Sequence, residues 1–142
     1  MWANSLSTLY HFEKNKVSPY QPLFEYLIHN YAQICSLIDL YSDFSDEAIS
    51  SQMSSKDKIL SEFDLSMIGF LHNAKVHLSC IWKDSPWLSL FLDIFEKLIE
   101  GKTVREMTHS LNVSTHTIQK CRFIVSNSLA TSYQVALLKK SA

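Results

Sequence analysis

Residues Phe95–Leu129 read FEKLIEGKTVREMTHSLNVSTHTIQKCRFIVSNSL, and this stretch decides how the chain is organised. Gly101 interrupts an apolar helical pattern at a point where a helix end favours a left-handed residue. Thr103, followed three residues later by Glu106, has the spacing of a capping box and predicts that a second helix begins there. Apolar residues at helical spacing predict its buried face, which consists of Val104, Met107 and Leu111.

A turn and a third helix follow directly. Asn112 stands at the turn, where asparagine adopts the left-handed conformation at low cost. Ser114 is a favourable N-cap for the helix after it. Ile118, Cys121 and Val125 have the spacing of one buried stripe on that helix. Two helices joined by a tight turn are typical of a DNA-binding helix-turn-helix. A helical hairpin that packs in the core and does not bind DNA has the same sequence pattern.

The polar side chains outside these apolar faces are the candidate DNA contacts. A recognition helix presents such groups to base edges and phosphates in the major groove. The candidate DNA-binding residues are Thr103, Arg105, Ser114, Thr115, His116, Gln119, Lys120 and Arg122. Near the start of the helix, Thr115 and His116 are the candidates for base edges, whereas Lys120 is a candidate for phosphate.

The composition indicates a helical, folded protein. The chain has 142 residues with 46% hydrophobic content, which is ample for a core. Only two glycines and three prolines are present, so a turn-rich β fold is not expected and the predicted class is all-α. We find no apolar run of membrane-spanning length and no signal peptide, and three cysteines do not suggest a disulfide framework. These features predict a cytoplasmic protein with no membrane association.

Charge is distributed unevenly along the chain. From Gly101 onward there are six Lys and Arg against one acid, a net charge of +5. Because the whole chain carries −1, the first hundred residues carry −6. A basic region that contains a helix-turn-helix suits phosphate contacts, whereas the acidic remainder suits protein partners. A solvated basic face without a function is the alternative.

Three regions are predicted along the chain. Residues 1–20 are an N-terminal arm, residues 21–85 a dimerisation and partner-binding region, and residues 86–142 the DNA-binding region. The second region is expected to begin with one long helix from Pro22 to about Tyr41, whose wide apolar face suggests a partner helix, with burial in the protein's own core as the alternative. Three short helices follow, predicted over Asp46–Met53, around Ile59–Phe63 and over Asp64–Ala74. In the third region, a helix over Trp87–Glu100 precedes the helix-turn-helix, whose last helix is expected to continue towards Leu138.

One short strand is predicted in this otherwise helical chain, at Val76–Trp82. Val76, Leu78, Cys80 and Trp82 alternate with the residues between them, a period of two. Since a lone strand has no partner, the strand is expected to pair with a second copy of itself in a homodimer. Residue 80 would then lie near its mate.

The middle of the chain resembles the FlhD family, dimer-forming subunits of a flagellar transcriptional activator that work with a zinc-binding partner, FlhC. The matching segments are LFEYLIHNYAQICSLIDLY, the acidic short-helix region, DLSMIGFLHNAKVHLSCIWKD and KTVREMT, together about Leu23–Thr108. The resemblance implies a heteromeric activator on flagellar or conjugative-transfer promoters, which would also meet RNA polymerase. It further implies that Cys80 is the candidate for a disulfide across the dimer. The chain departs from the family in a longer arm and in the extra helix Trp87–Glu100.

The segment LIEGKTVREMTHSLNVSTHTIQKCR is also similar to the DNA-binding module of LuxR-type regulators. This similarity keeps open a self-sufficient regulator that needs no second protein. A third hypothesis is an adaptor or antagonist whose helix-turn-helix packs and does not bind DNA. Because the first hundred residues are acidic, we expect the protein alone to bind its operator weakly and to gain affinity with a partner.

No catalytic or metal site is predicted. His72, His77, Cys80 and His109 lack the paired spacing of zinc ligands. His77 and Cys80 would point to opposite faces of the predicted strand, which excludes a base and nucleophile pair. We therefore expect no enzyme activity, no metal and no cofactor.

Overall fold

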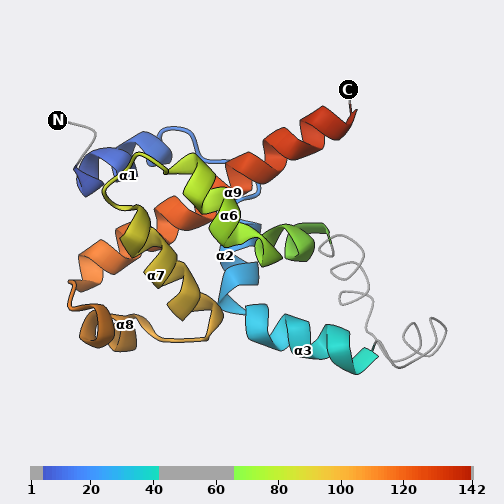
Figure 1. Ribbon diagram of the computed structural model, residues 1–142, viewed down its shortest axis with the longest axis horizontal. Coiled ribbons are helices and arrows are strands. Elements are labelled where there is room, and N and C mark those ends of the chain that lie inside the picture. The colour runs from blue at the N-terminus through green and yellow to red at the C-terminus, as the bar shows by residue number, and fades with distance from the viewer. Residues whose placement is uncertain (1–4, 42–65, 142) are drawn as a thin grey trace.

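The described part of the chain is built from α-helices. A computed structural model describes residues 5–41 and 66–141. Within these ranges no residue is in a strand, which confirms the all-α class. The helices are α1 (Leu6–Lys14), α2 (Gln21–His29), α3 (Tyr31–Tyr41), α6 (Ala74–Ile81), α7 (Leu88–Ile99), α8 (Val104–Leu111) and α9 (Thr115–Ser141), and residues 66–72 are also helical (Figure 1). The short helices predicted over Asp46–Met53 and around Ile59–Phe63 lie outside the described residues.

The long helix α9 is the centre of the arrangement. It packs against α1, α2, α6, α7 and α8, while α2 and α6 each also pack against α7. The last turns of α9 extend beyond the other helices at the upper right of the view, and α3 projects at the lower right (Figure 1). None of the described helices combines the length and the hydropathy that a bilayer-spanning segment needs.

The core explains why α9 is so long. Its predicted stripe of Ile118, Cys121 and Val125 is fully buried, and burial continues on all sides of the helix as far as Ala130. A helix that is enclosed on every face in its middle is the interior element of a bundle. The side chains that fill the core around it come from the other helices and include Phe24, Leu27, Met67, Leu78, Phe91, Ile94, Phe95 and Met107.

The predicted strand at Val76–Trp82 is wrong, because Val76–Ile81 lie within α6 and Trp82 is the C-cap residue of that helix. Ala74 and Leu78, four residues apart, are fully buried and Trp82 is half-buried, so the inward face follows helical spacing. Val76 is 61% exposed on the outward face. The apolar residues fit both periods, and a helix pairs its backbone groups locally, whereas a lone strand in a helical bundle leaves them unpaired.

The predicted long helix from Pro22 to Tyr41 is interrupted. Asn30 has φ −106° and ψ 15°, which ends α2 and allows α3 to begin one residue later. In the predicted N-terminal arm, residues Leu6–Lys14 form α1, which packs against α9. One hydrophobic cluster includes residues from all three predicted regions, for example Leu6, Leu78 and Ile118.

Candidate nucleic-acid interface

The start of α8 is fixed by reciprocal hydrogen bonds. The Thr103 hydroxyl accepts from the Glu106 backbone N–H at 3.1 Å, and the Glu106 carboxylate accepts from the Thr103 N–H at 3.1 Å. This is the predicted capping box. The bond from the Thr103 backbone holds the pKa of Glu106 below its ordinary value. The carboxylate also lies 3.9 Å from the ammonium of Lys102.

The turn between α8 and α9 has the backbone that its residues predict. Asn112 is left-handed, with φ 55° and ψ 47°. Gly101, before α8, has φ 82°, which is also left-handed. The Ser114 hydroxyl accepts from the Thr117 N–H at 3.2 Å and caps α9. These local contacts fix the direction in which α9 leaves the turn.

The first two turns of α9 have one buried and one exposed face. Ile118 and Cys121 are fully buried, whereas Thr115, His116 and Gln119 are exposed. Thr115 and Gln119 are one helical turn apart, so these three side chains occupy one continuous polar surface. Ser114, at the cap, is exposed beside them.

Two of the basic side chains predicted to contact DNA instead form hydrogen bonds with side chains of neighbouring helices. The Lys120 ammonium donates to the Ser7 hydroxyl of α1 at 2.8 Å. The Arg122 guanidinium donates to the Glu25 carboxylate of α2 at 3.4 Å. Both cations are half-buried and flank the polar surface of α9 on the sides of α1 and α2. Sequence patterns alone do not identify Ser7 and Glu25 as neighbours, because they lie about a hundred residues away along the chain.

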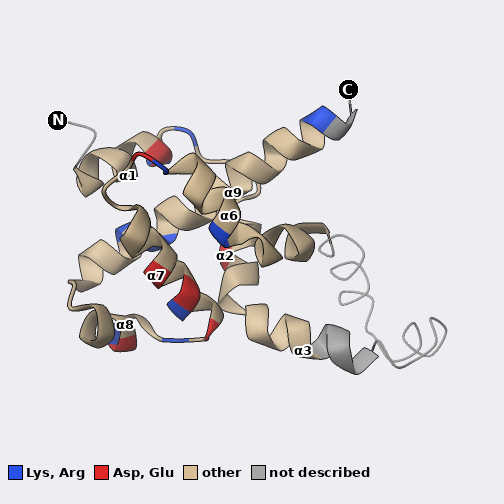
Figure 2. Cartoon of the chain, in the orientation of Figure 1, with Lys and Arg blue, Asp and Glu red and all other residues tan. Residues whose placement is uncertain are grey.

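The remaining charges are segregated around this surface. On α8, Arg105 is exposed, as is Thr103 at its cap. On α7, the exposed acids Asp93 and Glu96, together with Glu100 at the C-cap, form a face that also includes Lys97 and is acidic on balance (Figure 2). Lys75 of α6 pairs with Glu96 at 3.5 Å across that face. The protein therefore presents polar and basic side chains near the start of α9 and an acidic face on α7.

The cysteines and histidines considered as candidate site residues differ in exposure and in the side chains they contact. Cys80 is an exposed free thiol on α6, and its link to a second copy stays a prediction. Burial raises the pKa of the Cys121 thiol to about 12. His72 forms a hydrogen bond with the Tyr31 hydroxyl, and the His77 ring stacks on Phe70 with centroids 4.0 Å apart. In the part of the chain that the structure describes, no three His, Cys, Asp or Glu side chains are placed to hold a metal ion.

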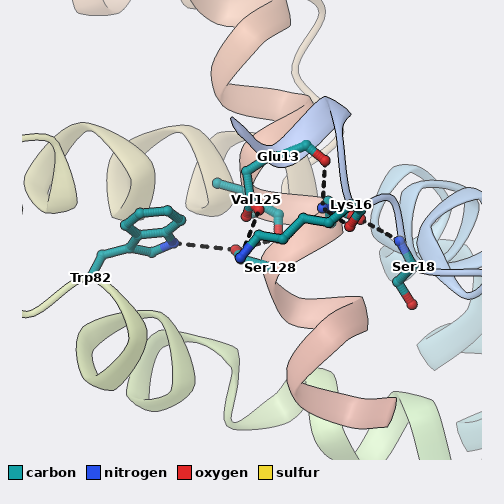
Figure 3. A network of polar contacts seen from close by, with 7 residues as sticks. Glu13, Lys16, Ser18, Trp82, Val125 and Ser128 are labelled. Carbon is teal, nitrogen blue, oxygen red and sulfur yellow. Dashed lines mark hydrogen bonds and ion pairs between the residues drawn. The ribbon is translucent and has the colours of Figure 1, made fainter. Parts of the chain in front are cut away.

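One buried polar residue was not singled out in the sequence, although it joins the N-terminal segment to α9. The Asn127 side chain is fully buried and accepts from the Ser18 backbone N–H at 2.9 Å. It also donates to the carbonyls of Glu13 and Lys16, at 3.3 Å and 3.4 Å (Figure 3). An asparagine between apolar positions of a long helix is the signal that could have indicated this role, because buried amides need partners.

No protein-family model, no curated protein and no solved structure matches this chain.

Proposed function

We propose that this chain is a DNA-binding transcriptional regulator, in which α8 and α9 act as a helix-turn-helix and the start of α9 enters the major groove. The observation that carries the proposal is the exposed polar surface of Thr115, His116 and Gln119. Its three side chains lie at the N-terminal end of a helix whose opposite face is buried. In helix-turn-helix proteins this end of the second helix contacts base edges.

The dimensions of this surface suit a groove. From Thr115 to Phe123 the helix rises about 12 Å at 1.5 Å per residue. This length is similar to the width of the major groove, about 12 Å, and spans roughly four base pairs at 3.4 Å each. Gln119 is the candidate for specific reading, because glutamine pairs with adenine through two hydrogen bonds in the major groove.

Phosphate contacts are assigned around the base-reading surface. Arg105 of α8 is exposed and available to one strand, whereas Thr103 is exposed but its backbone N–H and hydroxyl oxygen are engaged in the capping box, so that only its O–H can donate to a phosphate. Lys120 is adjacent to the surface on the side of α1. Arg122 is a weaker candidate, because its guanidinium would have to leave the carboxylate of Glu25 to reach a phosphate.

The partners that this function implies are duplex promoter DNA, a second copy of the chain, an FlhC-like subunit and RNA polymerase. A site of about four base pairs is too short for specificity, and a dimer doubles it by reading two half-sites one helical turn apart. Exposed apolar residues outside the polar surface, Val76 on α6 and Val135 and Leu138 near the end of α9, are available for such contacts. The acidic face of α7 favours a basic partner surface and not DNA.

The FlhD-type heteromer is one form of this proposal, and a self-sufficient LuxR-type regulator is the other. The feature that the FlhD resemblance drew on most, a short helix running into a strand at Val76–Trp82, is replaced by α6. The acidic net charge of the first hundred residues still favours a regulator that needs a partner for tight binding.

The proposal is tested by selecting binding sites from a random duplex library with the purified full-length protein. Gel-shift titrations of the selected site then compare wild type with Gln119→Ala. Loss of a paired base contact should weaken binding to the selected site by about 1–3 kcal/mol, or roughly 5- to 150-fold. Binding to unrelated DNA should be unchanged. Gln33→Ala, at an exposed glutamine of α3, is the matched control.

Three outcomes separate the hypotheses. A protein that binds no duplex at low salt, alone or with its genomic neighbour, contradicts DNA binding and favours the adaptor. Nanomolar specific binding by the protein alone favours the self-sufficient regulator. Specific binding that appears only with a co-purified partner favours the heteromer.

A further inference from the structure

Helix α1 runs beside α9 in the same direction. Ser7 contacts Lys120, the Tyr10 ring lies 5.6 Å from the Phe123 ring, and the segment after α1 meets Asn127. Residues later in α1 contact residues later in α9, so the two helices are parallel. As a result, the beginning of α1 lies at the same end of the bundle as the beginning of α9, where the candidate DNA surface is (Figure 1).

The exposed charge on α1 and the turn after it is positive. Lys14 and Lys16 are both exposed. Glu13, the one acid among residues 1–20, is only 4% exposed, and burial raises its pKa. The Glu13 carboxylate lies 4.0 Å from the Lys16 ammonium. It therefore partly offsets the charge of Lys16 but not that of Lys14.

Lys14 stands at the edge of the polar surface of α9. Its ammonium lies 4.1 Å from the centroid of the Phe123 ring and 5.5 Å from that of Tyr10. Phe123 is one helical turn beyond Gln119, so it continues the same face of α9. Lys120, held at Ser7, lies on the same side. Two cations from two helices thus border the surface on the side of α1.

The position of α1 is fixed by buried contacts. Asn127 binds the carbonyls of Glu13 and Lys16 and the N–H of Ser18, on both sides of the turn that follows α1. Figure 3 labels these three partner residues. Ser18 in turn donates its hydroxyl to Gln134 at 3.0 Å, further along α9. Lys14 is therefore carried by a helix that moves with α9 and not by a loose extension.

We propose that α1 is a second DNA-contacting element, in which Lys14, together with Lys120 of α9, binds the sugar-phosphate backbone beside the groove that α9 enters. This inference rests on the proposed function. It assigns a phosphate-binding role to a segment in which no DNA contact was predicted from the sequence. Such contacts fix the position of a recognition helix and carry no sequence information.

The test is a salt titration of DNA binding with the full-length protein and its selected duplex. Lys14→Met keeps an unbranched apolar side chain over Phe123 and removes the charge. Loss of one phosphate contact should reduce the slope of log K against log salt by about 0.9 and weaken binding roughly 3- to 10-fold at 0.1 M salt. Sequence preference should be unchanged, and Lys14→Arg should restore the slope.

Lys139→Met is the matched control, because it removes the same charge from the other end of α9. Lys139 is exposed and lies about 35 Å from His116 at 1.5 Å per residue. The inference is overturned if Lys14→Met leaves the slope and affinity unchanged while Gln119→Ala still loses specificity. If wild type binds no DNA, the proposed function itself fails, and the two failures are thereby distinguished.

Discussion

Replacing Asn127 with alanine should loosen the N-terminal segment from α9 at a predictable cost. The side chain makes three hydrogen bonds and is fully buried. The Glu13 carbonyl keeps another partner, the Lys16 N–H at 3.2 Å, and the Lys16 carbonyl belongs to an exposed residue that water can reach. The unavoidable loss is at Ser18, which is 5% exposed and whose N–H is left without its acceptor.

A buried N–H left unpaired costs about 1–3 kcal/mol, and each hydrogen bond that is replaced by water costs about 0.5–1.5 kcal/mol. We therefore expect Asn127→Ala to lower the free energy of unfolding by about 2–4 kcal/mol. For a chain of this size the melting temperature should fall by roughly 4 °C per kcal/mol, or about 8–16 °C.

Urea denaturation followed by circular dichroism measures the change, and Asn73→Ala is the control. Asn73 is an exposed residue whose side chain makes no cap hydrogen bond at α6, so its removal should cost less than about 0.5 kcal/mol. Hydrogen exchange should additionally show faster exchange of the Ser18 amide in Asn127→Ala. A loss below about 1 kcal/mol with unchanged exchange at Ser18 would refute the idea that Asn127 anchors the segment.

Two further predictions concern the α8 cap and the cysteines. Because the folded pKa of Glu106 is lowered, its charge contributes stability above its ordinary value of 4.5 that is lost as pH falls through the folded pKa. The stability gap between wild type and Glu106→Gln, measured by thermal denaturation, should therefore be present at pH 7 and close in acid; a gap that is constant with pH would contradict this. A maleimide should label the exposed Cys80 rapidly and Cys121, buried with a pKa of about 12, only after unfolding. Mass spectrometry of the labelled peptides distinguishes the two, and equal labelling rates in the native protein would contradict the burial of Cys121.

Local signals in the sequence predicted the second half of the chain well. The Thr103 cap, the left-handed Asn112 and the Ser114 cap each depend on residues within four positions, and each is confirmed. The apolar stripe of α9 was also correct, because Ile118, Cys121 and Val125 are fully buried, whereas on α8 Met107 is buried and Val104 and Leu111 are only half-buried. Where structure follows from neighbours in sequence, residue types and spacing were sufficient.

The errors arose where two local solutions fit the same residues. The apolar positions of Ala74–Trp82 satisfy a period of two and a helical period, and only packing against α9 and α7 decides between them. The helix break at Asn30 was not predicted, because no glycine or proline lies next to it in the sequence. The surroundings of Lys120 and Arg122 depend on α1 and α2, which approach α9 from distant parts of the chain.

The double role of α9 links these observations. Its first two turns leave Thr115, His116 and Gln119 exposed, whereas from Ile124 to Ala130 the helix is enclosed by the other elements. Within the enclosed stretch, the Gln21 amide of α2 donates to the Ser126 hydroxyl at 3.0 Å, and the segment after α1 meets Asn127. In the proposed DNA complex, these contacts would limit how far α9 enters the groove and would confine base reading to the start of the helix. Since the same contacts set the position of α1 and α2, the core would determine, in the proposed complex, how far α9 enters the groove and which flanking cations accompany it.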